Sequence, residues 1–482
     1  MTAATRGGVR QQALAALSYR WIVAGGAIAI GLLGGLLVHH EPNTAILVCV
    51  ALLAILAMAM LGDRAFPWAI AIVAVAPWYP FIAETAEAPV VKQKVLCAAV
   101  AAAALAPWLW SLALGGRRTR PSRAALLMAV LYVGLAIIIY ENLHSLSALI
   151  DSGIVGYIFI GVTFLCARRF GDGHGWPAAS FTGLVILLAL GADAYLRSPG
   201  TRVGYFTGYP ITYGALVAGL LPGALLFAYR RSRLLAAVIA AATAALLIFS
   251  QSRSSWVAVT VMLMAVALIQ ARAGNYRALR AIAAGIVLLV VLILSTSSLH
   301  RLVEEKLSAK ITTSQSVTHR EFSYSTGIRE VGERPVFGAE EPGFSAKESA
   351  SKTNIGAVDN GYLSIAADMG LVGLFAAFIP IAVALRVLVR CLRMRVSPTY
   401  ELALALGIVG IAVVTAFYDS FYWAQLDLLL GAMGGVLSVR VSRISRPTTA
   451  TDAPDEAVAW RQTGDLTPRL RERPLGWLGS SS

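Results

Sequence analysis

Long apolar segments recur along almost the whole chain, and they limit its possible folds more than any other feature of the sequence. They run from Trp21 to Val439 and are separated by short polar or basic stretches. About 20 apolar residues in a helix cross the hydrocarbon core of a bilayer. Because only 14% of the residues are charged, no water-soluble fold could hide this much apolar surface. We therefore expect an all-α integral membrane protein.

The apolar segments predict 14 transmembrane helices. Several segments are short enough that two of them could be re-entrant or merged, so 12 spans is the alternative. The predicted spans are Trp21 to Val38, Asn43 to Gly62, Phe66 to Ile82, Val95 to Leu114, Ala124 to Tyr140, Leu146 to Cys166, Ala178 to Leu196, Tyr209 to Tyr229, Leu234 to Phe249, Ser254 to Gln270, Ala281 to Leu299, Gly361 to Leu385, Leu402 to Phe417 and Trp423 to Val439.

Basic residues in the short connections are distributed unequally between the two sides of the predicted membrane. One side carries 23 arginines, and the other carries only Lys92, Lys94, Arg197, Arg202 and Arg253. Short cytoplasmic loops carry an excess of Arg and Lys, so both termini are expected in the cytoplasm. The formal charge of +14 is spread over short clusters between apolar runs, which predicts contact with membrane lipids and no binding of nucleic acid.

This topology divides the chain into five parts. They are a cytoplasmic tail at 1–20, transmembrane helices at 21–299, one large, partly helical extracytoplasmic loop at 300–360, transmembrane helices at 361–439 and a disordered cytoplasmic tail at 440–482. The four cysteines fall within or beside apolar runs, so we expect neither a disulfide nor a metal site. Several aspartates, including Asp427, and the glycines Gly361, Gly370 and Gly373 lie in or near the spans. We interpret the aspartates as boundary or functional residues and the glycines as close-packing or hinge positions.

Arginines on the extracytoplasmic side oppose the charge rule and therefore need a reason. Arg197 and Arg202 lie between the seventh and eighth predicted spans, and Arg253 lies in the tight connection SQSRSSW. Contact with lipid headgroups is one explanation. For Arg253 the surrounding serines favour another, because hydroxyls and a guanidinium together suit an oxyanion.

The large loop carries a further arginine in a predicted helix. Thr318 and Glu321 fit a capping box, and the helix is expected to end before Pro335. The spacing places Arg320, Tyr324, Ile328 and Val331 on one face, which we predict to be packed. A guanidinium there needs an anionic partner, either a carboxylate of the chain or a phosphate of a substrate. Since the arginine fork matches phosphate, converging outward arginines predict a site for a lipid-linked phosphate or diphosphate.

Four segments in this order resemble the O-antigen ligase and O-antigen polymerase superfamily. They are RVGYFTGYPITYGALVAGLLP, FSQSRSSW, HREFSYSTGIREVGERPVFGAEEPGF and VDNGYLSIAADMGLVGLF, and they cover roughly Arg202 to Phe375. The resemblance implies a GT-C-like glycosyltransferase of the bacterial cytoplasmic membrane that acts on its outer face. It implies an undecaprenyl-diphosphate-linked glycan donor, a glycan or glycolipid acceptor, no metal and no cofactor, and a polysaccharide assembly complex as a partner.

The resemblance also implies roles for particular residues. Arg202 and Arg320 fall where the family's diphosphate-binding arginines lie, and Arg253 matches its serine-arginine motif. Ligases have a histidine directly before the asparagine that ends the large loop, whereas this chain has Asp359 before Asn360. Aspartate is ordinarily the weaker base, so we favour a polymerase, with an O-antigen ligase acting on a lipid A core or another acceptor as the alternative.

The expected mechanism is inverting displacement at the anomeric carbon. Arg202, Arg320 and Arg253 stabilise the leaving diphosphate, while Asp359 accepts the proton of the attacking hydroxyl and Asn360 orients it. Four tyrosines are candidates for stacking on sugar rings, with anchoring at the membrane interface as the alternative: Tyr205, Tyr209, Tyr213 and Tyr362.

Two rival classes remain open at this point. A transporter or flippase of lipid-linked glycans would have broken helices and a site near the membrane midplane, whereas here the charges gather at one surface beside one long loop. A catalytically inactive scaffold of an assembly complex is suggested only by the aspartate at position 359.

Overall fold

A computed structural model describes about half of the chain, in separate stretches. These are residues 66–75, 97, 100–101, 123–142, 154–168, 175–198, 202–204, 207, 209–276, 279–280, 282–285, 287, 315–338, 360–394, 399–418 and 423–444. The chain divides into two compact units, Met1–Val441 and Ser442–Ser482. All interactions discussed below lie within the first unit.

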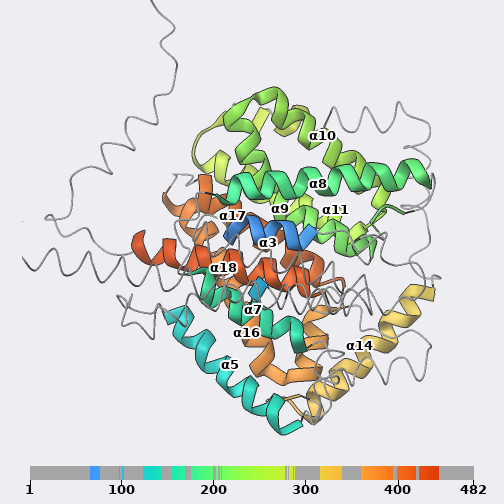
Figure 1. The fold of residues 1–482 in the computed structure, drawn as a ribbon, viewed down its shortest axis with the longest axis vertical. Coiled ribbons are helices and arrows are strands. Elements are labelled where there is room, and N and C mark those ends of the chain that lie inside the picture. Colours follow the sequence, from blue (N-terminus) through green and yellow to red (C-terminus); the bar gives the residue numbers. More distant parts are fainter. Residues whose placement is uncertain are drawn as a thin grey trace, which may run out of the picture. The chain divides into compact units, whose positions relative to one another are not determined.

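Every regular element of the described residues is an α-helix, as the apolar segments predicted (Figure 1). The helices are α3 (Phe66–Val75), α5 (Arg123–Asn142), α7 (Ile154–Ala167), α8 (Trp176–Arg197), α9 (Pro210–Arg231), α10 (Arg233–Ser250), α11 (Arg253–Arg272), α14 (Gln315–Glu333), α16 (Gly361–Met394), α17 (Thr399–Thr415) and α18 (Ala424–Ile444).

Six of these helices are long and apolar enough to cross a membrane, and they are α8, α9, α10, α11, α16 and α18. Shorter apolar helices occupy four further predicted spans, in α3, α5, α7 and α17. The predicted spans Trp21 to Val38 and Asn43 to Gly62, most of Val95 to Leu114 and of Ala281 to Leu299, and most of the large loop lie outside the described residues. The total of 12 to 14 spans therefore stays a prediction.

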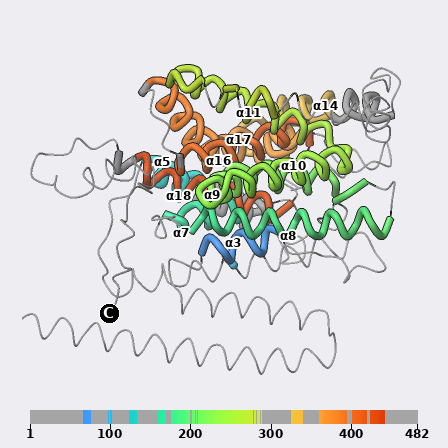
Figure 2. The backbone as a smooth tube through the Cα atoms, turned by 90° about the horizontal axis from the view of Figure 1, so that it is seen from above, coloured from blue at the N-terminus to red at the C-terminus, as the bar shows by residue number. Residues whose placement is uncertain are grey.

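Helix α9 lies at the centre of the described bundle and packs against α8, α10, α11 and α17. Figure 2 shows α8, α9 and α10 side by side. Pro210 occupies the first turn of α9, where its missing N–H costs no hydrogen bond. Small residues allow close approach of the neighbours, as is common between membrane helices. A Cβ on Gly407 of α17 would collide with the carbonyl oxygen of Gly219 in α9.

Replacing Gly407 with alanine should therefore destabilise the bundle, by about 1–3 kcal/mol as is usual for overpacking. The measurement is the thermal unfolding midpoint of the purified protein in detergent. Gly285→Ala is the control, because a Cβ at Gly285 meets no atom within 4 Å. Equal midpoints for the two variants would show that α9 and α17 do not depend on this close approach.

Helix α16 corresponds to a single predicted span but is broken at Gly370. This glycine has φ 64° and ψ −164°, so the helix consists of two stretches on either side of it. Residues 362 and 378 would lie about 24 Å apart along a straight helix, yet the rings of Tyr362 and Phe378 stack with their centroids 5.0 Å apart. The first stretch therefore folds back along the second. Gly370 had been predicted as a close-packing or hinge glycine, and it lies at the break and in close contact with the Val336 backbone.

Helix α14 packs beside α16 (Figure 1). The turn after α14 contacts α16 at its break. The Leu371 N–H donates to the Pro335 carbonyl over 2.8 Å, and the Val372 N–H donates to the Val336 carbonyl over 3.3 Å. These bonds satisfy two N–H groups at the start of the second stretch, which has no preceding helical turn to supply acceptors. The turn and the break therefore form one backbone joint.

Replacing Gly370 with alanine should disrupt this joint. A residue with a side chain pays about 1–3 kcal/mol in this conformation, and its Cβ would collide with the backbone of Val336 and Phe337. We expect a lower unfolding midpoint and faster proteolysis near residue 336. Gly332→Ala in α14 meets no atom within 4 Å and should change neither. A Gly370→Ala protein as stable as that control would contradict the prediction.

The predicted helix of the large loop exists as α14, with two corrections. It ends at Glu333, before Pro335 as expected, but begins at Gln315, so Thr318 lies inside the helix and is not its cap. The predicted packed face is also wrong in part, because Ile328 is 64% exposed while Thr326 and Glu330 are buried. The packing against α16 forms through Gly327, at which an added Cβ would meet Leu363. The packed face is rotated away from Ile328 because glycine permits the closer approach there.

Candidate functional site

Arg202 lies in the connection between α8 and α9. Residues 202–209 of this connection are called loop 202–209 from here on. Its Nε donates to the Ser250 carbonyl at the end of α10 over 3.3 Å, and its guanidinium carbon lies 5.9 Å from the centre of the Tyr209 ring. The described contacts of this side chain are thus a neutral carbonyl and an aromatic face, and neither is a carboxylate. A partly buried arginine in such a setting keeps its positive charge available for an anion.

Three aromatic residues connect Arg202 to the start of α16. The Tyr209 ring stacks on Tyr418 with centroids 5.7 Å apart. The Tyr418 hydroxyl accepts a 2.8 Å hydrogen bond from Trp423 Nε1, and its backbone carbonyl accepts one of 3.2 Å from the Gly361 N–H. These contacts bring together the ends of α9, α10, α16, α17 and α18 that the charge pattern places on one side of the membrane.

Asn360 is held in place as the N-cap of α16. Its Oδ1 accepts hydrogen bonds from the N–H groups of Tyr362 and Leu363 over 3.0 and 3.1 Å. Asparagine is a preferred N-cap for this reason. The cap fixes the side chain directly beside the hydrogen bond between Gly361 and Tyr418, so Asn360 lies in the same group of residues as Arg202 and Tyr209.

The serines around Arg253 form a compact turn between α10 and α11. Gln251 has the left-handed φ of 53° that ends α10. The Ser252 and Ser255 hydroxyls lie 2.7 Å apart, and Ser250 donates to the Leu247 carbonyl over 2.7 Å. Arg253 itself is exposed at the first position of α11. Since Arg202 bonds the Ser250 carbonyl, the two arginines flank the same turn.

Arg197 differs from the other two arginines because it is already neutralised. Its Nε lies 2.9 Å from Asp193, one helical turn earlier in α8, and both side chains are exposed. An exposed pair of this kind contributes little to stability. Arg197 is therefore a surface residue of α8 and serves below as a control.

Two of the predicted sugar-stacking tyrosines lie inside the protein. Tyr213 has 0% exposure in the core around α9, and Tyr362 donates its hydroxyl to the Ala412 carbonyl over 2.8 Å while its ring stacks on Phe378. Their surroundings explain them as packing residues, so we do not carry a glycan-binding role for them into the proposal below. Tyr209 is 37% exposed and is the described tyrosine best placed to face a ligand.

Three further site predictions cannot be located in space. Asp359 and Tyr205 lie outside the described residues, and Arg320 is described only as part of the α14 backbone. The site also contains Tyr418, Trp423 and Gln425, which the sequence did not single out. The first two stand at predicted span ends and Gln425 just inside the last span. Tyr418 and Gln425 contact segments some 200 residues away, and such contacts leave no local signal.

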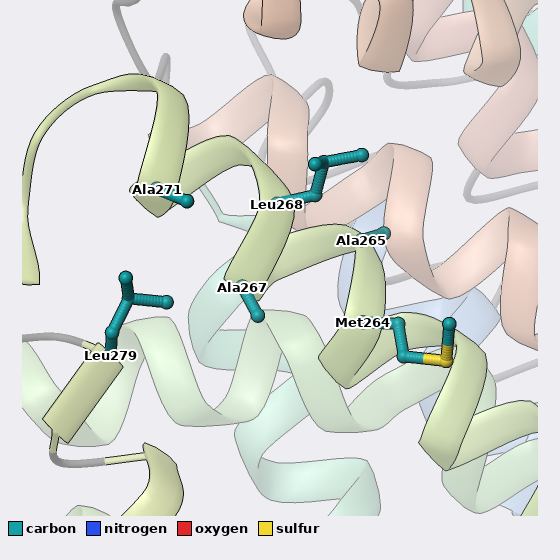
Figure 3. A pocket seen from close by; sticks show the side chains of 6 residues that line it. All are labelled: Met264, Ala265, Ala267, Leu268, Ala271 and Leu279. Atoms are coloured by element: carbon teal, nitrogen blue, oxygen red, sulfur yellow. The ribbon is translucent and has the colours of Figure 1, made fainter.

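A hollow among the described residues lies apart from this site. It has a volume of about 480 Å³ and is lined by Met264, Ala265, Ala267, Leu268, Ala271 and Leu279 (Figure 3). Its lining is apolar and lies toward the end of α11 opposite Arg253. A surface of this kind faces lipid in a membrane helix bundle.

In the described part of the chain, no group of three or more His, Cys, Asp or Glu side chains could hold a metal ion.

The fold and the site together define a helical membrane protein with cationic and aromatic groups gathered at one end of its helices. Residues 235–378 match the protein-family model described as O-antigen ligase. This match confirms the resemblance and supports membership of the chain in the O-antigen ligase and polymerase superfamily. At the level of the family, the match supports a membrane enzyme of the ligase or polymerase type. A comparison with curated proteins gives no match.

The matched range contains Arg253, Arg320, Asp359 and Asn360 but begins after Arg202. The hydrogen bond from Arg202 to Ser250 crosses that boundary. Arg202 is thereby joined to the matched region by a direct contact.

Proposed function

We propose that the protein transfers glycan from an undecaprenyl-diphosphate-linked donor on the outer face of the bacterial cytoplasmic membrane, as a polymerase. The proposal depends on the surroundings of Arg202. The described contacts of this side chain are uncharged, and one of them, with Ser250, reaches the region that matches the family model. Because none of these contacts is a carboxylate, the guanidinium is suited to bind a phosphate group. The family match supports a reaction of the ligase or polymerase type.

In the proposed reaction, an acceptor sugar hydroxyl attacks the anomeric carbon of the donor. The new bond joins the acceptor oxygen to that carbon, the bond from the carbon to the diphosphate oxygen breaks, and the configuration inverts. Arg202 and Arg320, helped by Arg253, stabilise the negative charge that develops on the leaving diphosphate. The step needs neither a metal nor a nucleotide sugar.

The acceptor side of the reaction is assigned to the entrance of α16. Asp359 takes the proton of the attacking hydroxyl, and Asn360, held as the N-cap, orients the acceptor. Tyr209, which is partly exposed beside Arg202, contacts the sugar. The proposed polymerase type rests on aspartate at position 359, where ligases of the superfamily have histidine. A ligase that uses a lipid A core or another acceptor is the alternative.

The direct test is an assay of the purified full-length protein with a carrier-linked glycan. Bond formation in detergent, where no second compartment exists, supports transfer chemistry and excludes a flippase. Movement of the donor across a vesicle membrane without bond formation would overturn the proposal.

Deletion of the gene separates polymerase from ligase. Loss of long chains, with single repeat units still attached to the final acceptor, indicates a polymerase. Accumulation of full-length chains on the carrier lipid would instead indicate a ligase.

A further inference from the structure

Gln425 is a fully buried amide in the first turn of α18. It has 0% exposure, and its Nε2 donates a 3.1 Å hydrogen bond to the Thr207 carbonyl in loop 202–209. Burial of an amide is unfavourable unless it makes such bonds; this bond satisfies the amide nitrogen, while Oε1 has no hydrogen-bond partner among the described residues. The bond joins parts of the chain that are 218 residues apart, so it is a specific tie between the last described helix and the loop that begins with Arg202.

Thr207 is the residue that organises loop 202–209. Its N–H and its hydroxyl both donate to the Gly204 carbonyl, over 3.0 and 2.7 Å. Gly204 has a φ of +119°, and a Cβ there would collide with Tyr213 and Pro210. These bonds join Thr207 to Gly204, so a group that holds the Thr207 carbonyl is linked through Thr207 to Gly204.

The other attachment of the loop is to α10. The Val203 N–H donates to the Phe249 carbonyl over 3.2 Å, next to the bond from Arg202 to Ser250. The loop is therefore tied to α10 on one side and to α18 on the other. Arg202 stands at its start and Tyr209 at its end, and the two residues that the ties hold, Val203 and Thr207, lie between them in the sequence.

We propose that Gln425 is a positioning residue for the diphosphate site, which acts through loop 202–209 to hold Arg202 and Tyr209 in place. This inference rests on the proposed function for the identity of the ligand. The hydrogen bond between Gln425 and Thr207 is present in the structure whatever the ligand is. Glutamine suits the task because its length reaches the carbonyl and its amide supplies a neutral donor, so no charge is buried.

The informative substitution is Gln425→Met, which keeps the length and most of the volume but removes the donor. Ser438→Ala is the matched control, because Ser438 is buried in the same helix and its hydroxyl donates to the Gly435 carbonyl of its own turn. Both variants should remain folded, with similar unfolding midpoints. They should differ in the behaviour of loop 202–209.

The first measurement is hydrogen–deuterium exchange of the peptide that covers loop 202–209, in full-length protein without ligand. Gln425→Met should raise the exchange of this peptide, and Ser438→Ala should leave it as in the wild type. Unchanged exchange in Gln425→Met would overturn the proposal whatever the protein binds.

The second measurement is the Kd for undecaprenyl diphosphate without a glycan. Gln425→Met should weaken binding about tenfold, as expected for loss of one buried hydrogen bond. In an Arg202→Ala background it should cause no further loss, since residues that act through one another are not additive. If the losses of binding affinity in the two variants were additive, Gln425 would not act through Arg202, and the proposal would be overturned. Failure of the wild type to bind would reject the proposed function, and the exchange result would still decide whether Gln425 holds the loop.

Discussion

Replacing Arg202 with alanine is expected to lower kcat/KM for glycan transfer by about 100- to 1000-fold, the usual effect of removing a group that stabilises charge in a transition state. Arg202 lies on the Tyr209 ring and its described contacts include no carboxylate, so its charge is available to act on a phosphate. Arg202→Lys should recover only part of the rate, because lysine keeps the charge and loses the planar fork. The measurement is the initial rate with purified protein and carrier-linked donor.

Arg197→Ala is the control for this prediction. Arg197 lies close to Arg202 in the sequence and carries the same charge, but it is exposed and paired with Asp193. Its removal should change the rate by less than about threefold, as for an ordinary surface pair. Equal losses in Arg197→Ala and Arg202→Ala would indicate a general effect of surface charge, and the assignment of Arg202 to the diphosphate would fall.

Replacing Asp359 with asparagine should reduce the rate by about 100-fold or more, which is the usual contribution of a general base. The substitution preserves size and removes the proton acceptor, so the unfolding midpoint and binding of undecaprenyl diphosphate should stay as in the wild type. Wild-type activity in Asp359→Asn would exclude this residue as the base while leaving the fold and the arginines unaffected.

Asp359→His provides a second readout that a structural role would not produce. Histidine is the residue that ligases of the superfamily have here, and it can accept a proton, so activity should be largely retained. On acidification, however, the variant should lose activity at a higher pH than the wild type, because imidazole becomes protonated at a higher pH than a carboxylate. Identical pH profiles would contradict a direct role in proton transfer.

Much of the described fold follows from hydropathy alone. Each predicted span that falls within the described residues coincides with a helix, usually to within a few residues, as for Tyr209 to Tyr229 and α9 at Pro210–Arg231. The reason is that a helix in lipid must satisfy its own backbone and present apolar side chains, which leaves a strong local signal. The relative placement of these helices depends on the close approach of small residues such as Gly219 and Gly407.

Hydropathy could not show the interruption of α16 at Gly370. The residues on both sides are apolar and form helix, so the averaged signal is continuous. For α14 the sequence pattern predicted the helix but an incorrect face, because the pattern assumed that Ile328 would be buried. The actual packing uses Gly327 against Leu363, and a glycine carries no hydrophobic signal.

The candidate site was predictable where arginines lay on the side of the membrane that usually has few basic residues. Arg202 and Arg253 were found because arginines on the extracytoplasmic side need a reason. The difference between Arg197 and Arg202 was not predictable, since it depends on an ion pair with Asp193 in one case and on Ser250 and Tyr209 in the other. Tyr418 and Gln425 are recognisable only from their contacts with distant segments.

The tie between Gln425 and Thr207, together with the stack of Tyr209 on Tyr418, has a consequence for biogenesis. A ribosome releases the arginine loop into the membrane long before it makes the last transmembrane helix. Until synthesis reaches Tyr418, the arginine loop lacks the ring that stacks on Tyr209, and until it reaches Gln425 the loop lacks the amide that holds Thr207. A nascent or truncated chain that ends before residue 418 should therefore be unable to act on carrier lipid, so activity begins only when synthesis is nearly finished.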